Sequence, residues 1–292
     1  MKYLALIGLL AVALACGGKG EKSPPVAPAA GPGRVVPADG VPIAYTVSGS
    51  GSPSLVFIHG WMCDQTFWAA QVEGFSASNR VVTIDLPGHG LSGTERQDWS
   101  VGALGGDVQV VVEHLDLDEV ALIGHSLGGP VALEAARLMP GRVIGVVAVD
   151  ALHDADFAYE PEQINAYLAA YEADFTATCG QFSRSMFRAG AEPALVERVT
   201  NDLCDAPPEI AIAVLRASFD YEPGPALAAV KVPVRCINAD MWPTNVEGNR
   251  KYHPDFDAEI MEGVGHFLMM EAPEEFNRRL SEILSNLDNP AH

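Results

Sequence analysis

The hydrophobic residues of the chain form short, nearly continuous apolar runs that alternate with segments of helical spacing. Uninterrupted apolar runs are typical of strands buried on both faces of a sheet. Such runs occur at 54–58, 80–84, 120–123, 142–149 and 232–237, with a short strand expected at 258–261 and a hairpin at 34–37 and 43–47. Helical spacing separates them at 66–75, 101–115, 131–138 and 273–287. The alternation predicts an α/β fold with a mostly parallel, eight-stranded type of sheet and helices on both faces.

The alternation stops between residues 151 and 225. This stretch shows helical segments at 161–175, 193–203 and 208–219 and no strand pattern. A helical excursion of this length between two strands predicts a lid, or cap, inserted after strand six above the strand ends. The core of the domain is then expected to comprise residues 34–150 and 226–292.

The N-terminus has the pattern of a secretory signal at residues 1–16. Lys2 precedes an apolar run at 3–14 that is too short to span a bilayer. The small residue before Cys16, and the glycines after it, resemble a bacterial lipoprotein signal, which implies cleavage before Cys16 and lipidation of its thiol. Residues 17–33, rich in Gly, Pro, Ala and Lys, are expected to be a flexible tether. Plain secretion is the alternative, because Ala13 stands where lipoproteins prefer leucine.

The net charge limits the classes of molecule that the protein can be expected to bind. The formal net charge of −20 disfavours nucleic acid and anionic membrane surfaces, since both need clustered Lys and Arg. A small neutral substrate is expected, with membrane contact only through a lipid anchor at the periplasmic or outer face of a cell.

Export also permits disulfides. Cys179 and Cys204 both fall in the lid and are the expected pair, the alternative being free buried thiols.

The stretch 119–129, EVALIGHSLGG, predicts a strand, a sharp turn and a helix with Ser126 at the apex. Such a turn strains the apical residue and exposes its side chain above the sheet, while small neighbours avoid collision. The backbone amide of Leu127, at the helix start, would point at an oxyanion formed there. A serine hydroxyl needs a base, and His266, in a glycine-containing loop after the last strand, is the best candidate.

Four blocks together resemble the α/β-hydrolase superfamily over residues 34–287. They are FIHGW at 57–61, DLPGHGLS at 85–92, GHSLGG at 124–129 and GVGHFLMMEAPEEF at 263–276. The resemblance implies a nucleophilic Ser126, a general base at His266 and an oxyanion hole formed by the backbone amides of Trp61 and Leu127. It implies no cofactor and no metal.

The acid that orients the histidine is ambiguous in the sequence. Superfamily members usually place it after the strand at 232–237, but that position is Trp242, and Asp240 is the nearest carboxylate. A minority of members, including some haloalkane dehalogenases, place it after the preceding strand, where this chain has Asp150. A carboxylate at the tip of a buried strand is costly unless it is partnered. We therefore expect Asp150, with Asp240 as the alternative.

These features favour an exported serine hydrolase that cleaves a carboxylic ester through an acyl-enzyme. Lactonase, amidase, carbon–carbon bond hydrolase and cofactor-free perhydrolase activities use the same triad and stay open. A non-catalytic binding protein that retains the fold is the alternative of another class. Lid residues at helical spacing suggest an apolar substrate site, although aromatics in this pattern more often form the core of a lid than the wall of a site. They are Tyr159, Tyr167, Tyr171, Phe175, Phe182 and Met186.

Overall fold

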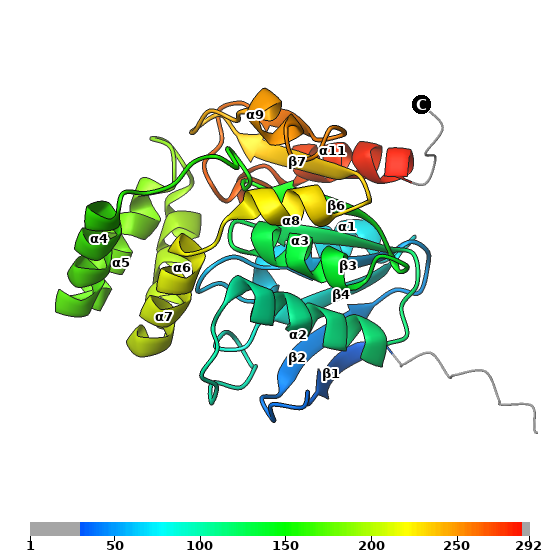
Figure 1. The fold of residues 1–292 in the computed structure, drawn as a ribbon, viewed down its shortest axis with the longest axis horizontal. Helices are drawn as coiled ribbons and strands as arrows, with labels where there is room; N and C mark the ends of the chain where they lie inside the picture. Colours follow the sequence, from blue (N-terminus) through cyan, green and yellow to red (C-terminus); the bar gives the residue numbers. More distant parts are fainter. Residues whose placement is uncertain (1–29, 288–292) are drawn as a thin grey trace, which may run out of the picture.

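The computed structural model describes residues 30–287 and shows one open sheet with helices on both faces (Figure 1). Cys16, the expected signal peptide and most of the expected tether lie outside the described residues. The sheet has eight strands in the order β1-β2-β4-β3-β5-β6-β7-β8. β1, β2 and β4 pair antiparallel, and every pairing from β4 through β3 to β8 is parallel. The predicted α/β fold with a mostly parallel sheet is confirmed.

The strands follow the apolar runs of the sequence. Their bounds are β1 Gly31–Val35, β2 Ile43–Ser48, β3 Ser54–Ile58, β4 Arg80–Asp85, β5 Val120–His125, β6 Val143–Val149, β7 Val234–Ala239 and β8 Asp257–Met261. β3 and β5 are buried along their whole length, as strands in the middle of a parallel sheet must be. β1 begins at Gly31, inside the stretch 17–33 expected as a tether. Backbone pairing of Gly31 with Val47 needs no apolar side chain, so the pattern did not reveal this extension.

Helices cover the sheet in two layers. Those of the core are η1 Gln65–Trp68, α1 Ala69–Phe75, α2 Val101–His114, α3 Gly128–Leu138, α8 Pro223–Ala229, α9 Val246–Arg250, α10 Leu268–Glu271 and α11 Pro273–Leu287. α3 packs against α2 and α8 on one face, in front in Figure 1, and α1 packs against α11 on the other. Among residues 30–287, no helix has both the length and the apolar character needed to cross a membrane.

Between β6 and β7 the chain forms a separate group of helices at one end of the sheet (Figure 1). They are α4 Pro161–Ala173, α5 Phe175–Ser185, α6 Pro193–Cys204 and α7 Pro208–Phe219. The expected lid boundary at residue 225 falls inside α8, which packs against α3 and so belongs with the core. The helix expected at 161–175 is α4, which ends at Ala173 because Asp174 leaves helical geometry and caps the next helix, α5, with its carboxylate.

A disulfide between Cys179 and Cys204 joins α5 to the end of α6. Cys63 and Cys236 are free and buried. Because α5 and α6 pack on each other with mostly short or polar side chains, a covalent link between them restrains a part of the chain with little apolar area of its own. The link closes a loop with a sequence separation of 25 residues.

Replacing both bridged cysteines by alanine is expected to lower the free energy of unfolding by about 3.5 kcal/mol, the loop-closure contribution for this length. Urea denaturation of the oxidised proteins measures the change. Cys236→Ala, which removes a buried free thiol, is the matched control. The expected loss is the part of the fall in unfolding free energy that exceeds twice the fall caused by this control. A double variant no less stable than that sum contradicts the prediction.

Candidate active site

Ser126 lies at the apex of the turn between β5 and α3. Its φ is 52°, in the left-handed region that non-glycine residues rarely adopt. Two glycines allow the strand and helix to approach: a Cβ on Gly124 would lie 2.0 Å from the carbonyl oxygen of Gly128, and one on Gly128 would lie 2.4 Å from that of Ile58. The turn is held by the Ser126 N–H, which donates to the Val149 carbonyl at 2.9 Å. The local sequence therefore builds the strained turn that was predicted.

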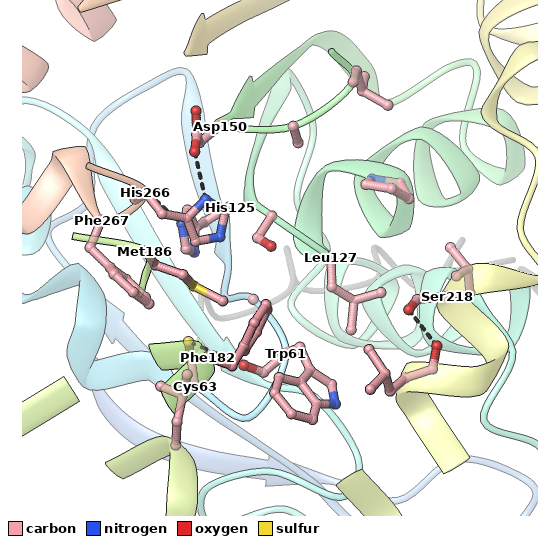
Figure 2. A pocket seen from close by; sticks show the side chains of 18 of the residues that line it. Trp61, Cys63, His125, Leu127, Asp150, Phe182, Met186, Ser218, His266 and Phe267 are labelled. Atoms are coloured by element: carbon pink, nitrogen blue, oxygen red, sulfur yellow. Dashed lines mark hydrogen bonds and ion pairs between the residues drawn. The ribbon is translucent and has the colours of Figure 1, made fainter. Parts of the chain in front are cut away.

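His266 meets Asp150 across the sheet edge. Its Nδ1 donates to Asp150 Oδ2 at 2.5 Å (Figure 2). Asp150 Oδ1 accepts the Ala239 N–H at 2.8 Å. The carboxylate is fully buried, and its backbone φ of 45° is also left-handed. Because a carboxylate can only accept here, His266 carries its proton on Nδ1, and its Nε2 is free to accept another.

The alternative acid, Asp240, lies outside this pair. Its Oδ1 accepts from the Arg188 guanidinium at 2.5 Å and from the Gly263 N–H at 3.0 Å. Trp242, at the position where the superfamily usually has the acid, packs its ring against His266 with centroids 5.8 Å apart. Of the two carboxylates weighed in the sequence, the structure brings Asp150 to the imidazole.

His153 is a neighbour of Asp150 that the sequence analysis did not identify. Its Nε2 lies 3.6 Å from Asp150 Oδ1, and its Nδ1 lies 3.2 Å from the hydroxyl of Thr244. Burial lowers the pKa of His153 against the opposing effect of Asp150. The sequence signal that could have identified His153 is its position three residues after Asp150, where the chain leaves β6.

Ser126, Asp150 and His266 line one cavity of about 280 Å³ between the sheet edge and the helices α5–α7. Figure 2 shows the Asp150–His266 pair on one side of it and Leu127 and Trp61 on the other. Its apolar wall includes Trp61, Leu127, Phe182, Met186, Leu215 and Phe267. The volume is near the lower end for small-molecule sites, so the cavity suits a small apolar ligand.

The six large apolar residues singled out in the lid lie in three different environments. Phe182 and Met186 line the cavity, as expected. Tyr171 and Phe175 are buried in the core, while Tyr159 and Tyr167 are 44% exposed and contact Phe219 on the outer surface. Helical spacing does not distinguish these environments, because in each of them the side chain contacts other apolar groups. Both environments weighed in the sequence therefore occur, a cavity wall for Phe182 and Met186 and packed core for Tyr171 and Phe175.

Trp61 and Leu127, whose backbone amides are the expected oxyanion donors, both line the cavity. Neither N–H donates a hydrogen bond to any group within residues 30–287. Leu127 precedes the first turn of α3, where amides have no partner in the helix. The Trp61 indole N–H donates to the Ala211 carbonyl of α7 at 2.8 Å, so this side chain connects the site to the lid helices.

Three other histidines lie in the four sequence blocks, and burial disfavours the charged form of each. Burial lowers the pKa of His59 to about 4 and that of His89 to about 3, and it holds the pKa of His125 well below its ordinary value. His59 Nε2 accepts the Leu86 N–H at 3.0 Å. These imidazoles brace loops around the site. In the part of the chain that the structure describes, no group of three or more His, Cys, Asp or Glu side chains could hold a metal ion.

Comparisons with known proteins identify relatives of the chain. The relative from Pseudomonas putida named "dihydrolipoyllysine-residue acetyltransferase component of acetoin cleaving system" is 26% identical over 261 residues, 82% of this chain and 65% of that protein. The chain thus spans less than two thirds of that relative's length.

Solved structures are similar over most of their length. Est816, described as an N-acyl homoserine lactone degrading enzyme, is 25% identical with a TM-score of 0.75, over 85% of this chain and 98% of its own. An esterase from Exiguobacterium antarcticum shares the fold at 20% identity, with a TM-score of 0.79 over 86% of this chain and 98% of its own. The model of the alpha/beta hydrolase family matches residues 55–279. Since that match covers well over half of the chain, the protein belongs to the alpha/beta hydrolase family.

Proposed function

We propose that the protein is a serine hydrolase that cleaves a small, apolar carboxylic ester through an acyl-enzyme. The observation that carries the proposal is the buried Asp150–His266 hydrogen bond beside a cavity that Ser126 also lines. The imidazole has its proton on Nδ1, so its Nε2 is available to take the proton of the Ser126 hydroxyl. In the described chain that hydroxyl makes no hydrogen bond to His266, and such contacts often form only once substrate is bound.

The reaction has two halves. Ser126 Oγ attacks the ester carbonyl while His266 Nε2 accepts the hydroxyl proton, and the oxyanion is bound by the free amides of Trp61 and Leu127. The tetrahedral intermediate expels the alcohol, which receives the proton from His266. Water then attacks the acyl-serine by the same route, releases the carboxylic acid and restores Ser126. Asp150 keeps the proton on Nδ1 and stabilises the imidazolium in both halves.

A lactone is the second candidate substrate, because a cyclic ester requires the same attack and because Est816, described as a lactone-degrading enzyme, shares 25% identity. Export is also part of the proposal, with lipid on Cys16 or as a secreted protein. The Cys179–Cys204 disulfide supports an oxidising compartment.

The wild-type protein is expected to release a burst of nitrophenol from p-nitrophenyl acetate, equal to one equivalent of enzyme, before its steady rate. A fluorophosphonate should add one adduct, which peptide mass spectrometry should locate at Ser126. Ser218→Ala, which removes another hydroxyl of the same cavity, should label normally. No adduct at Ser126 would favour a binding protein, and turnover of lactones alone would favour the second candidate.

A further inference from the structure

Three consecutive residues of the lid, Met186 to Arg188, contact the loop that carries His266. They follow α5 directly. The Met186 carbonyl accepts the backbone N–H of His266 at 2.8 Å. The residue before the histidine must be small, because a Cβ on Gly265 would lie 2.5 Å from that same carbonyl oxygen. The backbone of the lid therefore sets the height of the imidazole above the sheet.

The next lid residue holds the other side of the loop. The ring of Phe187 stacks on that of Phe267 with centroids 5.2 Å apart and planes at 23°. Phe267 is 1% exposed and also packs against the His266 ring at 5.3 Å. Because buried aromatic pairs have preferred geometries, this contact restrains the direction of the loop as it passes the cavity.

Arg188, the last residue of the lid segment, makes polar contacts with the loop that carries His266. Its Nε donates to the Val264 carbonyl at 2.9 Å, and its guanidinium also binds Asp240 Oδ1 at 2.5 Å. That same oxygen accepts the Gly263 N–H at 3.0 Å. The fork of one guanidinium thus spans the loop and the carboxylate after β7, which a single point charge cannot do.

We infer that the segment Met186–Arg188 is a positioning element for His266, with Arg188 its polar anchor and Asp240 its partner. The inference rests on the proposed function, because it assigns the segment to the proposed base. It also gives Asp240 a role: it holds the histidine loop through Arg188 and does not touch the imidazole. The Cys179–Cys204 disulfide fixes the helix that leads into the segment, so lid order and imidazole position are linked.

Arg188→Met, which keeps an apolar stem and removes every donor, is expected to lower kcat by roughly tenfold to a hundredfold, the effect of a displacement on the order of 1 Å in a catalytic group. KM should change less than about twofold, because Arg188 does not line the cavity. Arg188→Lys should have an intermediate kcat. The matched control is Arg198→Met, another half-exposed lid arginine, which bonds to Thr66 and Asp202 away from the histidine loop.

Proton NMR gives a readout that does not need turnover. The Nδ1 proton of His266, in a short bond to a buried carboxylate, should resonate far downfield in the wild type and in Arg198→Met, and should broaden or vanish in Arg188→Met. Loss of the signal without any ester hydrolysis by the wild type would refute the proposed function and keep the positioning role. Equal kcat and equal signals in the two methionine variants would overturn the inference. If Arg188→Met does not fold, a folded Arg188→Lys with wild-type kcat and signal overturns it too, and a lowered kcat at unchanged KM supports it.

Discussion

Ser126→Ala is expected to abolish the burst and to lower kcat for ester hydrolysis by a factor on the order of 10⁴ to 10⁶. The hydroxyl is the only protein group in the proposed mechanism that forms a bond to the substrate carbon. The substitution removes one oxygen, and the apical backbone, at φ 52°, is held by the Ser126 N–H and by the glycines around it. The fold and the binding of substrate should therefore persist. Stopped-flow and steady-state assays with p-nitrophenyl acetate measure both phases.

The residual rate is informative as well. With the hydroxyl gone, the free amides of Trp61 and Leu127 can still bind a carbonyl oxygen, so hydrolysis at roughly 10³ to 10⁴ times the uncatalysed rate is expected. Ser218→Ala, in the same cavity, should keep both the burst and kcat within about twofold, since Ser218 donates only to the Leu215 carbonyl of its own helix. A Ser126→Ala protein that retains its burst would show that another group carries the acyl chain.

The sheet was predictable because its strands are buried on both faces and so carry continuous apolar runs. α5 was not, because Phe175–Ser185 contains threonine, glycine and serine, which have low helix propensity. Its helix forms through an Asp174 cap, the disulfide and the burial of Phe175 and Cys179, and these are tertiary effects. The start of β1 was missed for a similar reason, since its pairing uses only the backbone.

The candidate site was predictable to the extent that local sequence builds it. The turn at Ser126 and the glycine-containing loop of His266 both have short-range patterns. The choice of carboxylate rested on one local feature, the place of Asp150 at the tip of a buried strand, and Asp240 stayed open because Asp150 and His266 are 116 positions apart and meet only in the folded sheet. Arg188 carries no pattern at all, since its acceptors are a backbone carbonyl and a carboxylate brought in by two other loops.

Asp150→Asn is expected to lower kcat by about 10⁴, the effect of placing the wrong tautomer on a catalytic histidine. An amide in place of the carboxylate can donate to His266 Nδ1, which then carries no proton. The proton moves to Nε2, and that nitrogen can no longer accept from Ser126. Since the side chain keeps its size, its oxygen can still accept the Ala239 N–H, and the strand end should hold its shape. KM should change little, and the melting temperature tests the fold.

Asp240→Asn is the matched comparison, because it makes the same chemical change at the other carboxylate. Its amide oxygen can still accept from Gly263 and Arg188, and the ion pair it loses is more than a third exposed on both sides, where such pairs contribute little. The fall in kcat is therefore expected to be less than about tenfold. The two variants assayed side by side on one panel of esters separate the assignments. If Asp240→Asn were the more damaging, the acid would act from the loop after β7, and the buried Asp150–His266 bond would hold the loop without serving the reaction.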